Sequence, residues 1–412
     1  MSDTLESLRA EYQSLRERNL SLDLTRGKPS AAQLDLANGL LDIPLSADHH
    51  DATGADLRNY GGTDGLVELR EIFSELLGIP VAQLLAGGNA SLQTMHDTVV
   101  QLLLHGAPGG EPWVGKEVAF LCPSPGYDRH FALTQALGIR MIAVPYLEDG
   151  SLDLPSIERH LADPAVRGMW LVPMYANPTG SVVDEATARA LVAMPAAAPD
   201  FRIFWDNAYA LHHLTDDEPA PLDILRFAEE AGNPDRVLVF ASTSKISQAG
   251  AGVAFFASSP ANIAWHRKHA SVQTIGPDKL VQLRHVRFFG DAEGVRAHMR
   301  RHRELLAPKF ALVDRILTER LSGHATWTKP TGGYFVTLSA PARTASRAVE
   351  LAKSIGVAVT PAGAAFPYGD DPHDSVIRIA PSMPPESELA QAIEALSVCV
   401  LLAEAELAAS GR

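Results

Sequence analysis

The sequence predicts an α/β fold built on a mostly parallel sheet. Six short apolar runs carry few polar residues, so they lack the in–out alternation of a strand with one exposed face. Strands that are buried on both faces have this composition, and the helical stretches between several of them favour parallel pairing. The runs cover residues 118–122, 140–144, 169–172, 203–205, 237–240 and 253–256.

Length and pattern together predict two domains. The 412 residues exceed what one hydrophobic core usually serves. A short amphipathic helix is expected over residues 4–19, and a long helical pattern covers 295–321, where Pro308 predicts a kink or a break. Strand-like segments at 326–338, 357–360 and 376–380 then indicate a smaller α+β domain. We therefore expect an N-terminal segment (1–45) that packs with the small domain, a large domain (46–294) and a small domain (295–412).

Composition narrows the possible partners. The formal net charge of −14 repels nucleic acid and anionic membranes, so we expect neither as a partner. Cys122 and Cys399 belong to no CxxC pair, so we expect two buried thiols, no disulfide framework and no metal site. No apolar run is long enough to span a bilayer, and the N-terminus lacks the pattern of a signal peptide. These features favour a cytoplasmic location.

A lysine follows the run 237–240. In Ser242-Thr243-Ser244-Lys245 it lies just beyond a buried strand and among hydroxyl side chains, which suit a phosphate. Burial lowers the pKa of a lysine, and a neutral amine can form a Schiff base with an aldehyde. The alternative is a surface lysine at a strand end.

Two other strand ends also carry polar side chains. Asp206 ends the strand that includes residues 203–205, at the sheet edge where open α/β folds bind ligands. On a pyridine ring, an aspartate there would keep the ring nitrogen protonated and make the ring an electron sink. Tyr209, and Asn177 in the turn after 169–172, could bond the phenolic oxygen of such a ring. The alternatives are a helix N-cap at Asp206 and an ordinary turn residue at Asn177.

Two further segments suit anions. Gly87 and Gly88 precede a helix that opens with Ser91-Leu92-Gln93, and free backbone N–H groups at a helix N-terminus bind phosphate well. The alternative is a plain serine cap at Ser91. Arg378 lies in a strand of branched residues, where its planar guanidinium suits a carboxylate held by two bonds or, alternatively, an internal salt bridge.

The order of these motifs resembles that of the fold-type I aminotransferases of the aspartate aminotransferase superfamily. The order is Asn177-Pro178-Thr179-Gly180, then Asp206 and Tyr209, then Ser242–Lys245, then Arg378; Tyr60-Gly61-Gly62 and Gly332-Gly333-Tyr334-Phe335 extend the likeness over nearly the whole chain. Segments 24–29, 123–130 and 242–256 are similar to the atypical subgroup Ic bacterial aspartate aminotransferases. The resemblance implies a large domain with a seven-stranded, mostly parallel sheet, and pyridoxal 5'-phosphate as the cofactor.

The resemblance also implies a role for each matching residue. Lys245 forms the Schiff base and moves the proton, Asp206 pairs with the ring nitrogen, and Tyr209 and Asn177 hold the phenolic oxygen. Arg378 binds the α-carboxylate of the substrate, with Gly27 against it. The remaining cofactor contacts are Tyr127 on the ring, Ser91, Leu92, Gln93 and Ser242 on the phosphate, and Tyr60 on the phosphate of the neighbouring subunit in a homodimer with shared active sites.

Two loop cations suggest the substrate. Arg129 follows Tyr127 by two residues and Lys28 lies beside Gly27, so either could meet the distal carboxylate of a dicarboxylate, Arg129 with the better two-bond geometry. We therefore expect aspartate and glutamate as amino donors, and 2-oxoglutarate and oxaloacetate as acceptors. The alternative for each residue is a solvated loop cation.

The likeness has one departure and leaves alternatives open. Most relatives carry an arginine in a Pro-Gly-x-Arg stretch after the lysine, whereas residues 248–253 contain none; Lys28, Arg26 or Arg284 could replace it. A β-lyase, or an aminotransferase for aromatic or kynurenine-type amino acids, would have the same cofactor residues. A transcription regulator with an aminotransferase-like domain would need a DNA-binding domain ahead of this one, and the acidic surface opposes it. A degenerate fold without cofactor is opposed by the intact Lys245, Asp206 and Asn177.

Overall fold

The predicted sheet is present in the computed structural model, which describes residues 4–411. Its seven strands lie in the order β2-β8-β7-β6-β5-β3-β4, and β8 alone runs antiparallel to its neighbours. The α/β class and the mostly parallel sheet are therefore confirmed. The strands are β2 (Leu84–Ala86), β3 (Ala119–Ser124), β4 (Arg140–Pro145), β5 (Val166–Leu171), β6 (Arg202–Asp206), β7 (Val237–Ser242) and β8 (Ala254–Ala257).

The apolar runs form strands because both faces of the sheet are covered. Along β6, Ile203 and Trp205 enter one buried cluster while Phe204 enters another on the opposite face. Every residue of β6, β7 and β8 is buried, and edge strand β4 alone among the predicted runs alternates with solvent. The six runs gave six strands with ends shifted by a few residues. Strand β2 was missed, because three residues at a sheet edge carry too short a pattern to distinguish from a loop.

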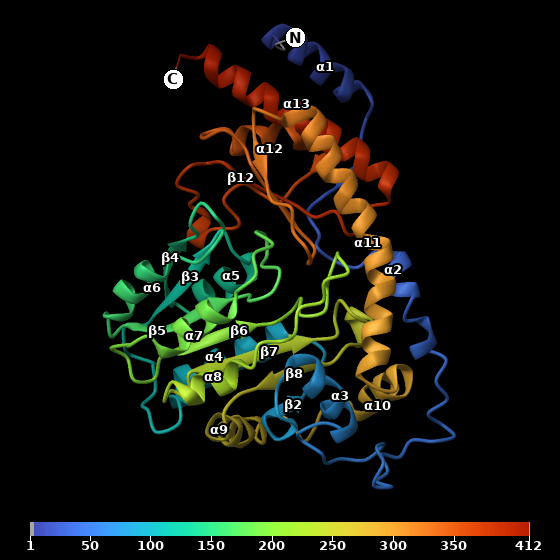
Figure 1. Cartoon of the computed structure of the whole chain (residues 1–412), viewed down its shortest axis with the longest axis vertical. Helices are drawn as coiled ribbons and strands as arrows, with labels where there is room; N and C mark the ends of the chain where they lie inside the picture. The colour runs from blue at the N-terminus through green and yellow to red at the C-terminus, as the bar shows by residue number, and fades with distance from the viewer. Residues whose placement is uncertain (1–3, 412) are drawn as a thin grey trace.

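Helices cover both faces of the sheet, as Figure 1 shows. The first cluster takes apolar residues from α3, α7, α8 and α10, and the second takes them from α4, α5 and α9. These helices and α6 are α3 (Val67–Leu77), α4 (Ser91–His105), α5 (Asp128–Ala136), α6 (Leu154–Leu161), α7 (Glu185–Ala193), α8 (Ile224–Glu230), α9 (Pro260–Ala270) and α10 (Lys279–Phe289).

The C-terminal part has its own core and a three-stranded antiparallel sheet in the order β12-β10-β9. Helix α11 (Ala292–Leu321) runs from the large sheet to this part (Figure 1). Of the two outcomes expected at Pro308, the break is wrong, because α11 is one continuous helix, and the kink stays a prediction. Pro308 faces solvent, so the carbonyl that loses its intrahelical partner can bond water instead. The other elements are β9 (Thr326–Trp327), β10 (Val336–Ser339), α12 (Ala345–Ser354), β11 (Val357–Ala358), β12 (Val376–Ile379) and α13 (Glu386–Ala409).

The N-terminal segment packs on the C-terminal part. Helix α1 (Leu5–Glu17) buries Leu8 and Leu15 in the core that α13 lines, and β1 (Leu22–Asp23) pairs in parallel with β11. Figure 1 shows α1 beside α13 at the end of the molecule away from the large sheet. These contacts support the division into 1–45, 46–294 and 295–412, which we keep as a proposal. Within residues 4–411 there is no helix both long and apolar enough to cross a membrane.

Candidate active site

The ends of two neighbouring parallel strands bring Asp206 and Lys245, the residues with the main predicted roles, to one edge of the sheet. Asp206 ends β6 opposite Phe240 of β7, and Lys245 follows the end of β7 after a short turn. The Nζ atom of Lys245 lies 4.7 Å from the centre of the Tyr209 ring, which the loop after β6 carries. The alternative of an N-cap at Asp206 is wrong, because residues 208–211 form a turn and no helix starts there.

Asp206 is buried and keeps one oxygen free. Its Oδ2 lies 3.0 Å from Nε2 of His130, a buried residue of α5 that stacks on Trp170. Its Oδ1 is buried and has no hydrogen-bond partner among residues 4–411. A buried carboxylate oxygen without a partner is costly unless a ligand supplies the proton. A protonated ring nitrogen is such a donor, so this atom fits the cofactor that the motifs imply.

The surroundings of Lys245 favour a neutral amine. Burial lowers the pKa of the Lys245 amine from its ordinary value, and the negative charge of Asp206 opposes that shift. Burial also raises the pKa of the Tyr209 hydroxyl well above its ordinary value, with smaller contributions from the Tyr127 and Tyr334 hydroxyls and Asp206. Tyr209 is therefore protonated and can donate a hydrogen bond. Tyr127 has a raised pKa for the same principal reason, and its ring centre lies 4.9 Å from that of His130.

The predicted phosphate loop lies at the start of α4. Ala90 is the N-cap and Ser91 is the first helical residue, so the plain serine cap is wrong. The first N–H groups of a helix have no intrahelical partner, which leaves those of Ser91 and Leu92 available. The Gln93 amide instead donates to the Ala90 carbonyl at 3.1 Å. Ser244 connects this loop to the lysine turn, because its hydroxyl donates to the Asn89 carbonyl at 3.3 Å. Ser242, two residues earlier in the chain, is buried.

Arg378 lies in β12 with its side chain largely buried. The guanidinium donates to Thr360 Oγ1 at 3.1 and 3.2 Å and to Asn177 Oδ1 at 3.4 Å. It also forms a 3.1 Å ion pair with Asp128, so the internal salt bridge weighed from the sequence is present. The contact with Asn177 joins β12 to the turn after β5. Arg378 is therefore fixed beside a predicted cofactor residue.

Gly27 and the Arg378 guanidinium both lie against the aromatic ring of Phe335. A Cβ atom added at Gly27 would lie 2.0 Å from Cζ of Phe335, so only glycine fits against that ring. The Arg378 guanidinium carbon in turn lies 5.0 Å from the centre of the Phe335 ring. The loop that carries Gly27 thus covers the guanidinium from the Phe335 side.

This arrangement matches a known protein family. A family model described as aspartate amino-transferase matches residues 1–411. The chain belongs to the aspartate aminotransferase family. It is an enzyme of the fold-type I aminotransferase class, as the order of its motifs implied.

Relatives of this aminotransferase extend over its whole length. A Mycolicibacterium smegmatis protein described as an aminotransferase is 57% identical over 402 residues, covering 96% of this chain and 94% of that protein. A Corynebacterium glutamicum aspartate aminotransferase is 50% identical over 405 residues, covering 97% and 94%. A solved aspartate transaminase from Corynebacterium glutamicum superposes with a TM-score of 0.96 at 49% identity, covering 99% of this chain and 100% of that one.

Three predicted residues of this aminotransferase lie outside these contacts. Lys28 and Arg129 are exposed, and neither forms an ion pair within residues 4–411. The Lys28 carbonyl accepts a 3.0 Å bond from Ser382, which anchors its loop just beyond β12. Tyr60 is 81% exposed, and no hydrogen bond joins it to the Lys245 turn within residues 4–411. The roles of all three remain predictions.

None of the three cations suggested as replacements for the missing phosphate arginine, Lys28, Arg26 and Arg284, forms a hydrogen bond with the predicted phosphate loop within residues 4–411. Arg26 is exposed in an ion pair with Asp23 at 3.6 Å. Arg284 lies on α10, and its Nε atom is buried without a hydrogen-bond partner among residues 4–411.

The sequence analysis did not identify His130 as a site residue. His130 lies three residues after Tyr127, about one helical turn away, and this spacing could have revealed it.

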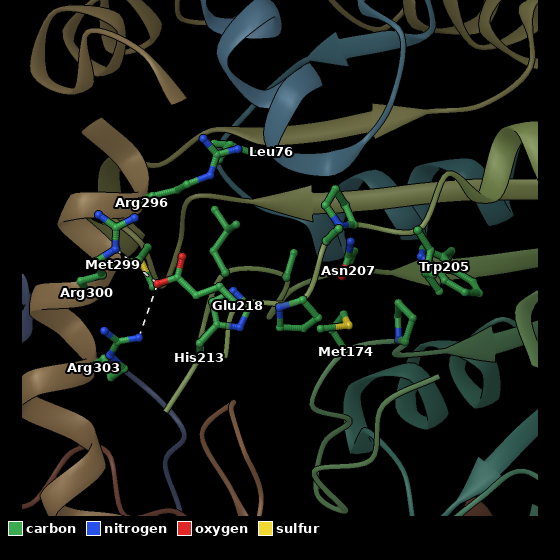
Figure 2. Close-up of a pocket in the computed structure, with 17 residues that line it drawn as sticks. Leu76, Met174, Trp205, Asn207, His213, Glu218, Arg296, Met299, Arg300 and Arg303 are labelled. Carbon is green, nitrogen blue, oxygen red and sulfur yellow. Dashed lines mark hydrogen bonds and ion pairs between the residues drawn. The ribbon is translucent and has the colours of Figure 1, made fainter. Parts of the chain in front are cut away.

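A second cavity lies behind the loop after β6. Figure 2 shows Glu218 pointing toward Arg300 and Arg303, with which it pairs at 3.3 and 3.4 Å. The loop separates this cavity from Lys245, because Tyr209 and His212 of the same loop contact that lysine. None of the predicted site residues lines the cavity. Its cations are already paired with carboxylates, so it does not extend the active site.

Proposed function

We propose that this aminotransferase moves an amino group between aspartate or glutamate and the acceptors 2-oxoglutarate or oxaloacetate, with pyridoxal 5'-phosphate on Lys245. The free, buried Oδ1 of Asp206 is the observation that carries the cofactor assignment. The 50% identity to a protein named aspartate aminotransferase supports the choice of substrate. When bound, the protonated ring supplies an electron sink for the negative charge that develops at the substrate's α-carbon.

Each residue of the site would have a role that follows from its position around the cofactor. Asp206, fixed by His130, would keep the ring nitrogen protonated, and Tyr209 and Asn177 would bond the phenolic oxygen. Ser91, Leu92, Gln93 and Ser242 would hold the phosphate, and Tyr127 would cover the ring. A Lys245 amine of lowered pKa could remove the α-proton of the substrate and return it to the cofactor carbon.

Substrate recognition would rest on cations at both ends of a dicarboxylate. Arg378 would bind the α-carboxylate, with Gly27 and Asn177 close by, through the two-bond geometry of its guanidinium. Arg129 or Lys28 would meet the distal carboxylate. The exposed ring of Tyr60 supports a homodimer with shared active sites, in which that tyrosine reaches the phosphate of the neighbouring subunit. A cytoplasmic location remains part of the proposal.

Two experiments test this proposal. Borohydride treatment of the yellow protein should fix the colour on Lys245, and mass spectrometry would identify the labelled residue. A panel of amino donors with 2-oxoglutarate should then rank aspartate and glutamate first. A preference for aromatic or kynurenine-type donors, or elimination from cysteine conjugates, would favour the alternative substrates while leaving the cofactor assignment intact. A label on another lysine would contradict the cofactor assignment itself.

A further inference from the structure

In the turn that carries Lys245, two backbone carbonyl groups receive no hydrogen bond from a backbone amide within residues 4–411. The amides of Ile246 and Ser247 both donate to the Thr243 carbonyl at 2.9 Å, which closes the turn around Lys245. Within residues 4–411, no backbone amide donates to the carbonyl oxygens of Lys245 or Ile246. Enclosed carbonyl groups need donors, because leaving them unpaired costs free energy. Side chains must therefore provide these bonds.

Buried side chains from three separate parts of the chain provide them. His212, in the loop after β6, places Nε2 3.3 Å from the Lys245 carbonyl oxygen. The hydroxyl of Tyr334, just before β10, donates to the same oxygen over a long 3.5 Å contact. His298, on α11, places Nε2 2.8 Å from the Ile246 carbonyl oxygen.

A second row of side chains links these donors. The Gln33 amide nitrogen, from α2 (Ala31–Asp35), donates to the Tyr334 hydroxyl at 2.9 Å and lies 3.1 Å from Nδ1 of His302. An amide nitrogen only donates, so Tyr334 keeps its proton for the Lys245 carbonyl. For the same reason Nδ1 of His302 accepts, and its Nε2 carries the proton, 3.1 Å from Nε2 of His298. The Nε2–H groups of both histidines then share one acceptor, the Ile246 carbonyl oxygen, whose hydrogen bond with His302 opposes the lowering of that histidine's pKa.

The cluster of His212, Gln33, His298, His302 and Tyr334 is almost free of solvent and uncharged. Each of the five side chains belongs to a residue that is at most 5% exposed. Burial lowers the pKa of His302 to about 3, helped by the neighbouring His298 and Arg301. Burial likewise lowers the pKa of His212 to about 3, with smaller contributions from the nearby Lys245 and His302 side chains. The cluster therefore acts through neutral hydrogen bonds near neutral pH.

We propose that this five-residue cluster positions the Lys245 amine. It holds the carbonyl groups of Lys245 and Ile246 from the loop after β6, from α11 and from the chain just before β10, and Gln33 of the N-terminal segment links these donors. The role of Lys245 as the proton carrier rests on the proposed function. A flexible lysine side chain transfers a proton efficiently only from a fixed backbone, and displacements near 1 Å can cost on the order of a hundredfold in rate. The cluster holds this backbone in place through neutral hydrogen bonds, so it adds no charge near the amine.

Matched substitutions separate positioning from general stability. Tyr334→Phe and His298→Leu each remove one donor, and His298→Gln keeps an N–H donor at that position. Tyr12→Phe is the control, because the Tyr12 hydroxyl also donates to a backbone carbonyl, that of Leu351 at 3.2 Å, far along the chain from the lysine turn. Two readouts are needed: the isotope effect with α-deuterated aspartate, and labelling of Lys245 in the apoprotein.

The donor-removing variants should lower kcat about tenfold or more with little change in KM, because the loss occurs at proton transfer. Their α-deuterium isotope effect should rise, whereas a smaller folded fraction would leave that ratio unchanged. His298→Gln should recover most of the loss, and Tyr12→Phe should match the unmodified enzyme. Unchanged isotope effects in Tyr334→Phe and His298→Leu would overturn the proposal.

The labelling readout keeps the test independent of the proposed reaction. An amine-reactive reagent, followed by mass spectrometry, gives the rate at which Lys245 of the apoprotein reacts as a function of pH. Both donor-removing variants should change this rate profile, and Tyr12→Phe should not. If the enzyme transferred no amino group at all, the proposed function would fail while this comparison still decided the positioning role. Identical labelling profiles in all variants would contradict positioning.

Discussion

His130 holds one oxygen of Asp206 at 3.0 Å, and the other oxygen of that carboxylate is left without a partner in the described structure. The two side chains come from α5 and from the end of β6, and both are buried. The bond fixes the orientation of the carboxylate and directs its free oxygen to the site. This relationship makes the state of His130 a direct test of the cofactor assignment.

Replacing His130 with phenylalanine should weaken cofactor binding. His130→Phe keeps an aromatic ring against Trp170 but removes the donor to Asp206, and a lost bond to a charged group costs about 1.5–3 kcal/mol. The dissociation constant for pyridoxal 5'-phosphate, followed by absorbance, should rise about tenfold to a hundredfold. His105→Phe, at an exposed position on α4, should leave it unchanged. Equal affinities in the two variants would count against a role for His130.

Replacing Gly27 should impair substrate binding more than folding. The new methyl group of Gly27→Ala would meet Phe335 at 2.0 Å and push the loop or the ring away from Arg378. We expect KM for the amino donor to rise about tenfold to a hundredfold, as misplaced binding groups usually cause. At Gly250 an added Cβ would meet nothing within 4 Å, so Gly250→Ala is the control in the same kinetic assay. A normal KM in Gly27→Ala would show that the ring moves freely.

Binding of the substrate's distal carboxylate should depend on Arg129 more than on Lys28. Arg129→Ala should lower kcat/KM for aspartate about tenfold to a thousandfold, the loss expected when a charged partner is removed. Alanine or phenylalanine, which lack the second carboxylate, should be affected far less. Lys28→Ala, measured with the same donors, provides the comparison, since Lys28 is also an exposed loop cation. An equal loss for both kinds of donor would mean that Arg129 is structural.

Hybrid dimers should reveal a shared active site. Tyr60→Phe and Lys245→Ala should each be strongly impaired, because the first removes the proposed phosphate contact and the second removes the proposed catalytic amine. A dimer with one subunit of each kind would contain one intact site, so mixing the variants should restore part of the activity. Tagged purification of the mixed dimers and a transamination assay would measure it. Verified hybrids without activity would contradict the contribution of Tyr60 across the interface.

Acid should destabilise the protein partly through His302. Its pKa of about 3 lies below the value of 6.5 for an unfolded chain, so the unfolded state binds more protons between these limits. Stability is then fully present above pH 6.5 and falls by about 1.4 kcal/mol per pH unit for this group as the pH drops. His302→Gln should therefore lose about 2–3 kcal/mol less than the unmodified protein between pH 6.5 and 4.5 in urea unfolding. The same substitution at the exposed His50 should keep the original slope.

The sequence alone determined the local structure and the chemistry of single residues. Apolar runs predicted six of the seven sheet strands, because burial on both faces leaves a composition that can be read locally. Lys245, Asp206 and Asn177 were found for a related reason, since each follows or ends such a run. The same local pattern missed β2, which is too short to show one. It also allowed a helix break at Pro308 that does not occur, because the free energy lost at a helical proline depends on whether solvent reaches the unpaired carbonyl.

Only the tertiary structure decided which side chains meet. His130 and Asp206 are 76 positions apart in the chain, Arg378 and Asp128 are 250 apart, and Gln33 and Tyr334 are 301 apart. No periodicity connects such residues, because their contact depends on how strands, helices and the two cores pack rather than on local backbone preference. The charge state of Lys245 and of the histidines beneath it follows from the same packing, since burial sets the cost of a charge. The sequence therefore predicted which groups react, and packing determined their partners and their protonation.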